Sequence, residues 1–385
     1  MKFAFPGVAL GSFNPLSAFL DRWFPTPRFL EPSAVGVDVS DVSVKWVALD
    51  SLKHVRSFGT VPLEPGIVVG GVIKDVDALA STLSVLREQD ITEAHVALPE
   101  ETAYVFTTVV PDDTTREQIL RMVEFEFEGK VPISPQASVY DFDVVSGRGE
   151  VHMREVGVVV FPRELAENYA SAFAHAGIRL LSFELEARSI ARAVFSSHDI
   201  LEEPVTLLVD FGRLRSGIAV LKSGVPIFTA TVGVGGKAME HSLMETMSCT
   251  KEEAERFRNE QGLFADVAAH KKEIEIVTST AVALANEVNR YYHFWDTHKN
   301  DKGERATPVS RIVLVGGSSN LHGLEEYIAS RVQVPTVRGD IWHNVFSYDD
   351  YIPPISRRAS LGYATSVGLA MRGIQQQYDP NLLTV

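Results

Sequence analysis

The chain has 385 residues, of which 45% are hydrophobic and 22% are charged, so it can bury a core larger than that of one compact domain. Its 50 acidic residues outnumber its 36 Lys and Arg residues, and the net charge of -14 argues against nucleic-acid binding, which depends on cations that neutralise phosphates. Cys249 is the only cysteine, which excludes an internal disulfide and a cysteine-based metal cluster. These features predict two lobes and a reducing compartment.

We expect neither a membrane span nor an export signal, because no apolar run approaches about 20 residues and the first 30 residues lack both a basic region and a continuous apolar one. Residues 1–34 are instead expected to form a leader, in which Asn14 and Pro15 begin a short helix that Pro25 ends. The apolar stripe of this helix consists of Leu16, Phe19, Leu20, Trp23 and Phe24. The stripe fits docking on the protein's own core and also docking on a membrane surface or a partner.

Lobe I begins at residue 35. Residues 35–49 place β-branched side chains in steps of two, which predicts a hairpin with its turn at Ser40 and Asp41. A helix is expected over residues 77–89 and a buried strand over residues 95–98. Residues 35–101 would therefore make the first part of this lobe.

Residues 102–183 have the pattern of a small α/β module inserted into lobe I. A strand over 102–110 leads to an amphipathic helix over 115–129, which Thr114 or Thr115 caps. The remaining expected elements are strands near 138–145 and 155–161 and a helix over 163–176. Residues 184–203 then return the chain to lobe I through a connecting helix.

Lobe II, residues 204–356, begins by repeating the design of the first hairpin: an apolar strand, an Asp at its end, a turn and a second apolar strand. Aligned by hand, Asp38 falls on Asp210 and Ser43 falls near Ser216, which indicates two halves related by duplication. The later elements are expected at 237–247, 251–260 and 270–298 (helices), RIVLVGG (strand), 321–331 (helix) and 359–372 (a last helix, within the segment 357–374 that returns towards lobe I). Residues 375–385 form a tail.

The two aspartates at strand ends, Asp38 and Asp210, are candidates for an ATP site between the lobes. Carboxylates hold Mg²⁺, usually through water, while the amides and hydroxyls of the turns cradle phosphate oxygens. Gly316 and Gly317 follow a third buried strand, where the missing Cβ lets a flat ligand approach the backbone. Each feature alone also fits an ordinary turn, so the hypothesis depends on their combination.

These three segments, in this order, resemble the phosphate 1, phosphate 2 and adenosine motifs of the actin, Hsp70 and sugar-kinase superfamily. Within it, the chain resembles the PilM family of type IV pilus assembly proteins, which is related to FtsA. The resemblance covers residues 35–373 and is carried by VGVDVSDVSVKWVALDS, GVPIFTATVGVGGKAMEHSLMETMSCTKEEAERFR, LANEVNRYYHFW, VGGSSNLHGLEEYIASRVQVP and SVGLAMRG. It implies an α/β, actin-like fold of two duplicated, ribonuclease H-like lobes, with the inserted block as a 1C-type subdomain.

The resemblance implies ATP or ADP with Mg²⁺ as cofactors. The implied nucleotide ligands are Asp38, Ser40, Ser43 and Lys45 at phosphate 1, Asp210, Gly212 and Ser216 at phosphate 2, and Gly316, Gly317 and Ser318 at the nucleoside, with Asp38 and Asp210 at the metal. Glu186 stands where the superfamily often places an acid that orients water, although a Glu favoured by a helix dipole fits equally well. Glu252, Glu255 and Arg258 match a stretch that contributes to adenosine binding, with an exposed ion-pair face as the alternative.

The phosphate loops depart from the family pattern. Ser40 and Asp41 stand where many relatives have Gly-Ser, and Arg213 and Leu214 add bulk to the second loop. A carboxylate roughly 5 Å from a phosphate oxygen costs about 3 kcal/mol at an effective dielectric near ~20, unless Mg²⁺ or Arg213 neutralises it. We therefore expect weak, strongly Mg²⁺-dependent nucleotide binding and, at most, slow ATP hydrolysis.

The resemblance also implies a partner, the short cytoplasmic N-terminus of the membrane protein PilN, in a groove between the 1A and 1C subdomains. The helix over 115–129 would line this groove with Ile119, Met122, Val123 and Phe125 or Phe127, although core packing is the alternative for most of them. Other proteins of the inner-membrane pilus complex and self-association are further implied contacts. The expected location is the cytoplasm, at the inner face of the cytoplasmic membrane, with only peripheral membrane contact.

The tail carries Asn381, Leu382 and Leu383, which resemble the Asn-Leu-Leu pattern of PilN leader peptides. One hypothesis places this tail in the PilN groove of the same or a neighbouring molecule, and a frayed tail is the alternative.

Three rival functions share the fold. A small-molecule kinase would need a catalytic Asp at a substrate pocket, and the sequence offers no convincing candidate. A nucleotide-free scaffold fits the altered phosphate loops, and an FtsA-like filament protein of the division site is the third rival. His293 and His298 lie five residues apart on an expected helix and hence on different faces, which indicates surface histidines rather than metal ligands.

Overall fold

The computed structural model describes residues 34–50, 52–145, 152–196, 205–299, 303 and 305–378. The leader helix and the docking of Asn381, Leu382 and Leu383 fall outside these residues and stay predictions. Within the described ranges, every helix is too short or too polar to cross a membrane.

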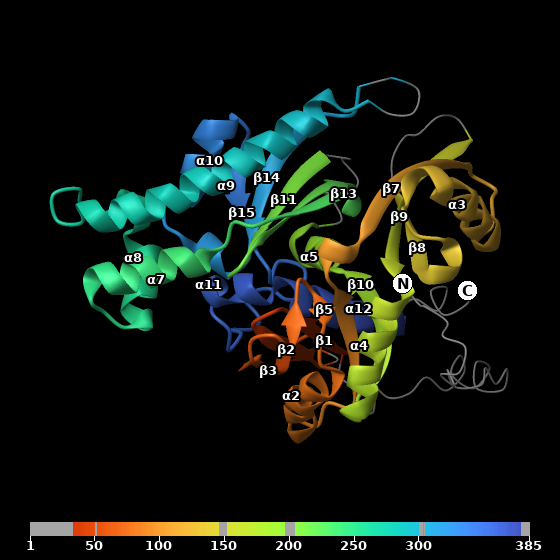
Figure 1. Ribbon diagram of the computed structural model, residues 1–385, viewed down its shortest axis with the longest axis horizontal. Coiled ribbons are helices and arrows are strands. Elements are labelled where there is room, and N and C mark those ends of the chain that lie inside the picture. Colours follow the sequence, from red (N-terminus) through yellow and green to blue (C-terminus); the bar gives the residue numbers. More distant parts are fainter. Residues whose placement is uncertain are drawn as a thin grey trace.

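Lobe I is built on a five-stranded sheet with the order β10, β6, β1, β2, β3 (Figure 1). Its strands are β1 (Ala34–Val39), β2 (Ser43–Leu49), β3 (Val55–Pro62), β6 (Glu93–Leu98) and β10 (Arg179–Leu185). The first three form an antiparallel meander, whereas β6 and β10 run parallel to β1. β1 and β2 are buried almost throughout, which explains why their sequences are nearly continuous apolar runs.

Four helices pack around the lobe I sheet. They are α2 (Val76–Glu88), α4 (Arg163–His175), α5 (Glu186–Val194) and α12 (Ala364–Tyr378). α12, near the end of the chain, packs across β1, β2 and β6 and against α5, while α2 and α4 pack together beside β10. α12 can lie this close to β1 because Gly36 has no Cβ, which would stand 2.0 Å from the Ser366 carbonyl oxygen.

Lobe II repeats the same sheet with the order β13, β12, β11, β14, β15. Its strands are β11 (Val205–Phe211), β12 (Ser216–Lys222), β13 (Val225–Val232), β14 (Val309–Val315) and β15 (Thr336–Arg338). Again a meander of three strands is followed by two parallel ones, which confirms the predicted duplication. Asp38 pairs with Lys45 and Asp210 with Gly217, so the register equivalent of Ser43 is Arg215, one residue before Ser216.

One face of the lobe II sheet is covered by helices. They are α7 (Gly236–Met247), α8 (Lys251–Glu260), α9 (Lys271–Thr297) and α10 (Leu324–Val332), of which α9 is the longest. Leu207 and Val209 of β11 belong to the core under these helices, whereas Leu208 belongs to the core shared with lobe I. This alternation follows from the two-residue period of a strand and holds the two lobes together through apolar contact.

The inserted module has the three-stranded order β7, β9, β8 with α3 packed on one face (Figure 1). Its elements are β7 (Tyr104–Pro111), α3 (Arg116–Lys130), β8 (Ser138–Val145) and β9 (Met153–Pro162). Thr115 and Gln118 form a capping box that starts α3 where the sequence predicts it.

The burial of α3 corrects the expected partner groove. Ile119 and Val123 are 1% and 0% exposed and belong to the module's own core, so their side chains are closed to a partner. Met122 is partly buried against the same core, and Phe125, at 86% exposure, is the prominent apolar side chain on the helix surface. The apolar face of α3 therefore serves the module itself.

Several elements have no counterpart in the sequence prediction. They are β3, the two-residue strands β4 (Val68–Val69) and β5 (Val72–Ile73), β10, β15 and the short α11 (Arg357–Ser360). The helix expected over 321–331 begins later, at Leu324, because a 3-10 turn over Gly317–Asn320 comes first.

Candidate functional site

A cavity of about 470 Å³ lies between the lobes, lined by the turns of both duplicated hairpins, by the end of β14 and by one face of α8. The sequence-predicted residues that line it are Asp38, Ser40, Ser43, Lys45, Glu186, Asp210, Gly212, Glu255, Arg258, Gly316, Gly317 and Ser318. Residues from five separate parts of the chain thus meet around one space.

Two predicted ligands lie outside this cavity. Ser216 is fully buried, and its hydroxyl donates to the Val234 carbonyl at 2.6 Å, so it stabilises the second hairpin instead. Glu252 is exposed on α8, and Lys251 lines the cavity in its place. Lys251, Glu255 and Arg258 share a helix face because they are four and three residues apart, whereas Glu252 is rotated off that face.

The turn of the first hairpin closes on itself. The Ser40 backbone N–H donates to the Ser43 carbonyl at 2.9 Å, and the Ser43 N–H donates to the Ser40 hydroxyl at 3.2 Å. Beyond the turn, the Lys45 ammonium donates to the Gly362 carbonyl at 2.7 Å, which links β2 to the segment before α12. Lys45 thus stands at the cavity wall with its charge held by a single carbonyl and Asp38 beside it in register.

The second turn is held by lobe II contacts around Gly212. Its carbonyl accepts from the Ser318 hydroxyl at 2.9 Å, and its N–H donates to the Arg215 carbonyl at 3.1 Å. Gly316 has φ +87°, and a Cβ there would stand 2.3 Å from Asp210 Oδ1. Only glycine therefore fits between β14 and the Asp210 carboxylate.

Protons are held more tightly than in isolated acids by four side chains in or beside the cavity, Asp38, Glu100, Glu186 and Asp210. Burial raises the pKa of Asp210 to about 6, helped by the charge of Asp38, and burial also raises the pKa of Asp38 although Lys45 opposes it. The pKa of Glu186 lies well above its usual value because of burial and then Asp38. Burial and the charge of Asp210 raise the pKa of Glu100 to about 8. These carboxylates crowd negative charge into a poorly solvated space.

A divalent cation would relieve this crowding. Among the residues that the structure describes, no three His, Cys, Asp or Glu side chains are grouped to hold a metal by themselves. Mg²⁺ normally keeps several waters and takes one or two carboxylates together with phosphate oxygens. Asp38 and Asp210 supply those two carboxylates, so the donor set fits Mg²⁺ that arrives with a nucleotide.

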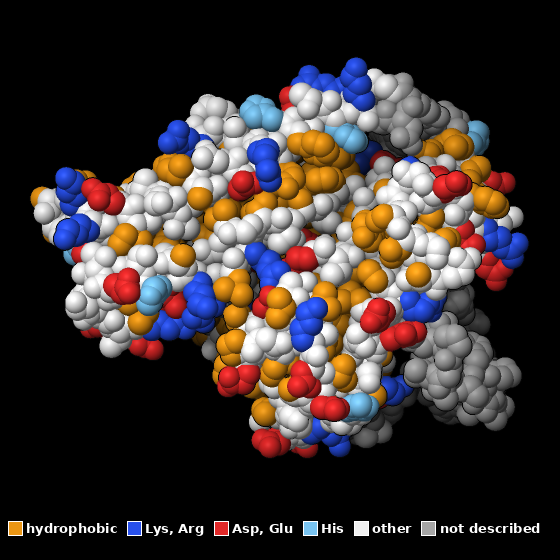
Figure 2. Space-filling view, in the orientation of Figure 1, with side chains coloured by type: hydrophobic (Ala, Val, Ile, Leu, Met, Phe, Trp, Pro, Cys, Tyr) orange, Lys and Arg blue, Asp and Glu red, His pale blue; other side chains and the backbone are white. Residues whose placement is uncertain are grey.

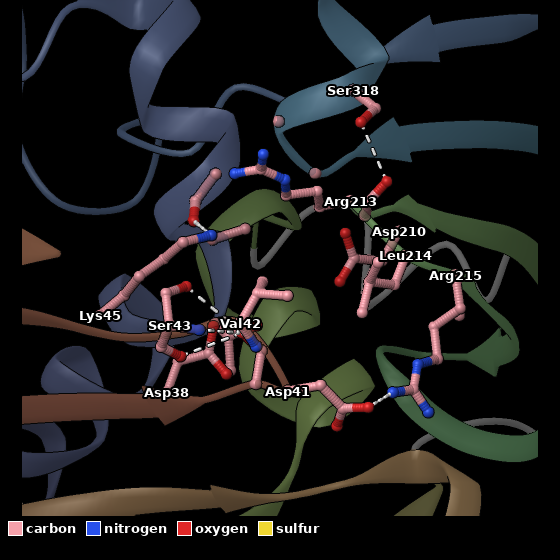
Figure 3. Close-up of a pocket in the computed structure, with 18 of the residues that line it drawn as sticks. Asp38, Asp41, Val42, Ser43, Lys45, Asp210, Arg213, Leu214, Arg215 and Ser318 are labelled. Carbon is pink, nitrogen blue, oxygen red and sulfur yellow. Dashed lines mark hydrogen bonds and ion pairs between the residues drawn. The ribbon is translucent and has the colours of Figure 1, made fainter. Parts of the chain in front are cut away.

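Sequence reasoning missed the main partner of Asp41. Arg215 forms an ion pair with Asp41 (Figure 3) and a second one, at 2.7 Å, with Glu101. Arg213, the expected partner, instead pairs with Glu240 of α7 at 3.2 Å. The only sequence signal for Arg215 is its register equivalence to Ser43, and that depends on the correct hairpin alignment.

The surface shows no sign of a nucleic-acid site on the side drawn in Figure 2. Among the side chains coloured there, basic and acidic groups are interspersed, and the basic ones make no continuous surface. Phosphate-backbone binding needs such a surface.

Comparison with known proteins identifies the family. A sequence model described as the type IV pilus assembly protein PilM matches residues 36–374. A structure described as the PilM-PilN type IV pilus biogenesis complex is similar to this chain at a TM-score of 0.71 and 19% identity, covering 90% of this chain and 99% of the other.

Two further structures share the fold at lower similarity. The ethanolamine utilization protein EutJ from Carboxydothermus hydrogenoformans aligns at a TM-score of 0.51 and 17% identity, covering 90% of this chain and 91% of that one. MreB5 of Spiroplasma citri bound to ADP aligns at 0.53 and 11%, covering 92% and 99%. The chain has the two-lobe, actin-like α/β fold and belongs to the family of the type IV pilus assembly protein PilM.

Proposed function

We propose that this protein is a nucleotide-binding adaptor in the inner-membrane assembly complex of a type IV pilus or a related secretion system. It binds ATP or ADP with Mg²⁺ between its lobes and works in the cytoplasm at the inner face of the membrane. The observation that carries the proposal is that duplicated hairpins bring Asp38, Lys45 and Asp210 to one cavity. The ADP-bound MreB5 of the same fold supports the choice of ligand.

The cavity residues divide the work of holding a nucleotide. Bound Mg²⁺ would supply the charge that offsets the phosphates, with Asp38 and Asp210 holding it, largely through water. Lys45 and the backbone amides of both turns would contact phosphate oxygens, and Gly316, Gly317 and Arg258 would surround the nucleoside.

Hydrolysis is expected to be slow. Glu186 lines the cavity, and burial together with the charge of Asp38 raises its pKa well above the usual value, which favours its protonated form. A protonated carboxyl cannot accept a proton from the attacking water, so Glu186 is a weak general base. ATP binding without rapid turnover suits an adaptor whose two states differ by its nucleotide.

Titration calorimetry with Mg-ATP tests the site. Asp38→Ala and Asp210→Ala should each weaken binding by roughly 100-fold, because each removes half of the metal's protein ligands. Asp113→Ala, in an exposed loop of the inserted module, is the control and should bind like the unchanged protein. Equal Mg-ATP affinity in all four proteins would rule out the proposed site. A heat of ATP binding measured without Mg²⁺ would rule it out as well.

The same proposal includes a PilN-like N-terminal peptide as partner, supported by the PilM-PilN complex among the similar structures. With Ile119 and Val123 in the module core, we place the peptide where the inserted module meets lobe I. The cavity at this junction has a volume of about 20 Å³, room for about one water, so the peptide would lie over the junction rather than inside it. Its lining residues are Asp141, Phe142, Asp143, Val159, Glu184, Leu185 and Arg188.

Arg188 makes a polar contact across this junction. Its Nε donates to Asp143 at 2.9 Å, so one arginine of α5 joins lobe I to β8 of the module. Arg188→Ala should weaken binding of a PilN N-terminal peptide by roughly 10-fold in fluorescence anisotropy. Arg121→Ala, an exposed arginine of α3, is the matched control. If Met122→Ala weakens peptide binding and Arg188→Ala does not, the peptide binds at α3 and not at this junction.

A further inference from the structure

We propose that Arg215 is a positioning residue of the nucleotide site, which clamps the second phosphate turn to lobe I and holds the Asp41 carboxylate away from the phosphates. The inference rests on the proposed nucleotide site and adds to it a residue that regulates closure of the lobes.

The clamp joins two lobes through one guanidinium. Arg215 lies in the turn between β11 and β12 of lobe II, whereas both of its partners, Asp41 and Glu101, lie in lobe I. The three side chains are 26%, 14% and 23% exposed, so water screens the ion pairs only partly. A planar guanidinium suits such a fork because its donors point in fixed directions.

Asp41 is fixed from its other side as well. Its carboxylate accepts from the backbone N–H groups of Gly70 at 2.9 Å and Gly71 at 3.0 Å, in the turn between β4 and β5. In Figure 3 the Asp41 side chain points towards Arg215, while Ser43 and Lys45 lie on the other side of the turn. The negative charge that the sequence places beside the phosphates is therefore neutralised and oriented before any nucleotide binds.

The clamp is also a wall of the cavity. Arg215 and Glu101 line the nucleotide cavity and, on their other side, an open cavity of about 620 Å³. Removing the Arg215 side chain would leave the Asp41 charge uncompensated near the phosphates, with Gly70 and Gly71 still bonded to the carboxylate, and would open the wall between the two spaces. Both effects weaken the hold on a nucleotide, and they concern its phosphates rather than its nucleoside.

Calorimetry on a set of variants tests the electrostatic role. Arg215→Ala should weaken Mg-ATP binding by roughly 10-fold and leave adenosine binding unchanged. Adding Asp41→Asn should restore part of the ATP affinity, because one of the two carboxylates that lose Arg215 is then neutral, and a purely structural role would give no such rescue. The Mg-ATP affinity of Arg215→Lys should lie between those of Arg215→Ala and the unchanged protein. Unchanged ATP affinity in Arg215→Ala, or a double variant as weak as the single one, would overturn the proposal.

Amide hydrogen exchange without nucleotide tests the mechanical role independently. Arg215→Ala should speed exchange at Gly70, Gly71 and residues 212–216 at least several-fold, since the lobes lose their tie there. Arg213→Ala is the matched control, because its pair with Glu240 lies wholly within lobe II. Identical exchange in Arg215→Ala and the unchanged protein would disprove the clamp. If the unchanged protein binds no ATP, the proposed function fails, while this measurement still decides the clamp.

Discussion

The two duplicated hairpins share a backbone design but carry opposite charges at their turns. The β1–β2 turn holds Asp41, whereas the β11–β12 turn holds Arg213 and Arg215. Both hairpins keep an acid, Asp38 or Asp210, near the strand end. The acids are thus the shared part of the site, and the turns have diverged so that the two halves attract each other.

The residues that pair with the two acids across each hairpin also differ between the lobes. Lys45 stands opposite Asp38 and brings a cation into the cavity, while Gly217 stands opposite Asp210 and has no side chain. A Cβ on Gly217 would lie 2.9 Å from Glu100 Oε2, so lobe II leaves room there for an acid of lobe I. Lys45 of lobe I is therefore the cation that we expect to face the phosphates, whereas lobe II supplies space and the interlobe tie.

The largest expected effect comes from a substitution at Gly316, which lies between β14 and the Asp210 carboxylate. Gly316→Ala should abolish nucleotide binding and destabilise the protein by about 2 kcal/mol or more, because a Cβ at φ +87° meets both Asp210 and the Phe211 carbonyl. Calorimetry and urea unfolding measure both effects. Gly129→Ala is the control, since nothing lies within 4 Å of its added Cβ, and it should be neutral or slightly stabilising. Normal ATP binding by Gly316→Ala would contradict the assigned geometry.

A smaller effect should separate the two hairpins. Lys45→Ala should weaken Mg-ATP binding by roughly 10-fold, since it removes the cation that faces the phosphates. Gly217→Ala, at the equivalent position of lobe II, should change the affinity less than about threefold, because only the flexible end of Glu100 must move. Similar losses in both variants would show that the lobes do not divide the work in this way.

The smallest effect concerns Glu100, which lobe I buries beside Gly217. Its pKa is raised from 4.5 to about 8, so between these values the folded protein holds a proton that the unfolded chain releases. Stability without Mg²⁺ should therefore fall as the pH rises through this range. Glu100→Gln removes the titrating group, and at a pH slightly above about 8 it should be more stable than the unchanged protein by about 1 kcal/mol or more. Urea unfolding curves that coincide at all pH values would argue against a buried, protonated Glu100.

Local patterns in the sequence predict the long elements well. The helix expected over 270–298 is α9 (Lys271–Thr297), and the one expected over 115–129 is α3 (Arg116–Lys130). Apolar periodicity and caps are encoded within a few residues, which makes such segments legible without tertiary context. β15 has only three residues, too few to show a periodic pattern. β10 runs directly into α5, so no turn marks the end of that strand.

The site is predictable only as far as it is local. Asp38, Asp210 and Gly316 follow from the repeat and from the glycine pair, and all three line the cavity. The Arg215 clamp joins residues 174 positions apart and depends on how the lobes dock. No local sequence pattern encodes that docking. The misplacement of Ser216 has a simpler cause, because matching serines by type shifted the hairpin by one residue, and a shift of one turns a side chain to the other face.

A crystal structure with Mg²⁺ and a non-hydrolysable ATP analogue would show whether Asp38 and Asp210 face one metal-nucleotide site. We predict density for the analogue in the interlobe cavity, with its phosphates at the two hairpin turns and Mg²⁺ reached by both carboxylates, directly or through water. An empty cavity at saturating analogue, or a metal that contacts neither Asp38 nor Asp210, would show that the two aspartates do not form a metal-nucleotide site.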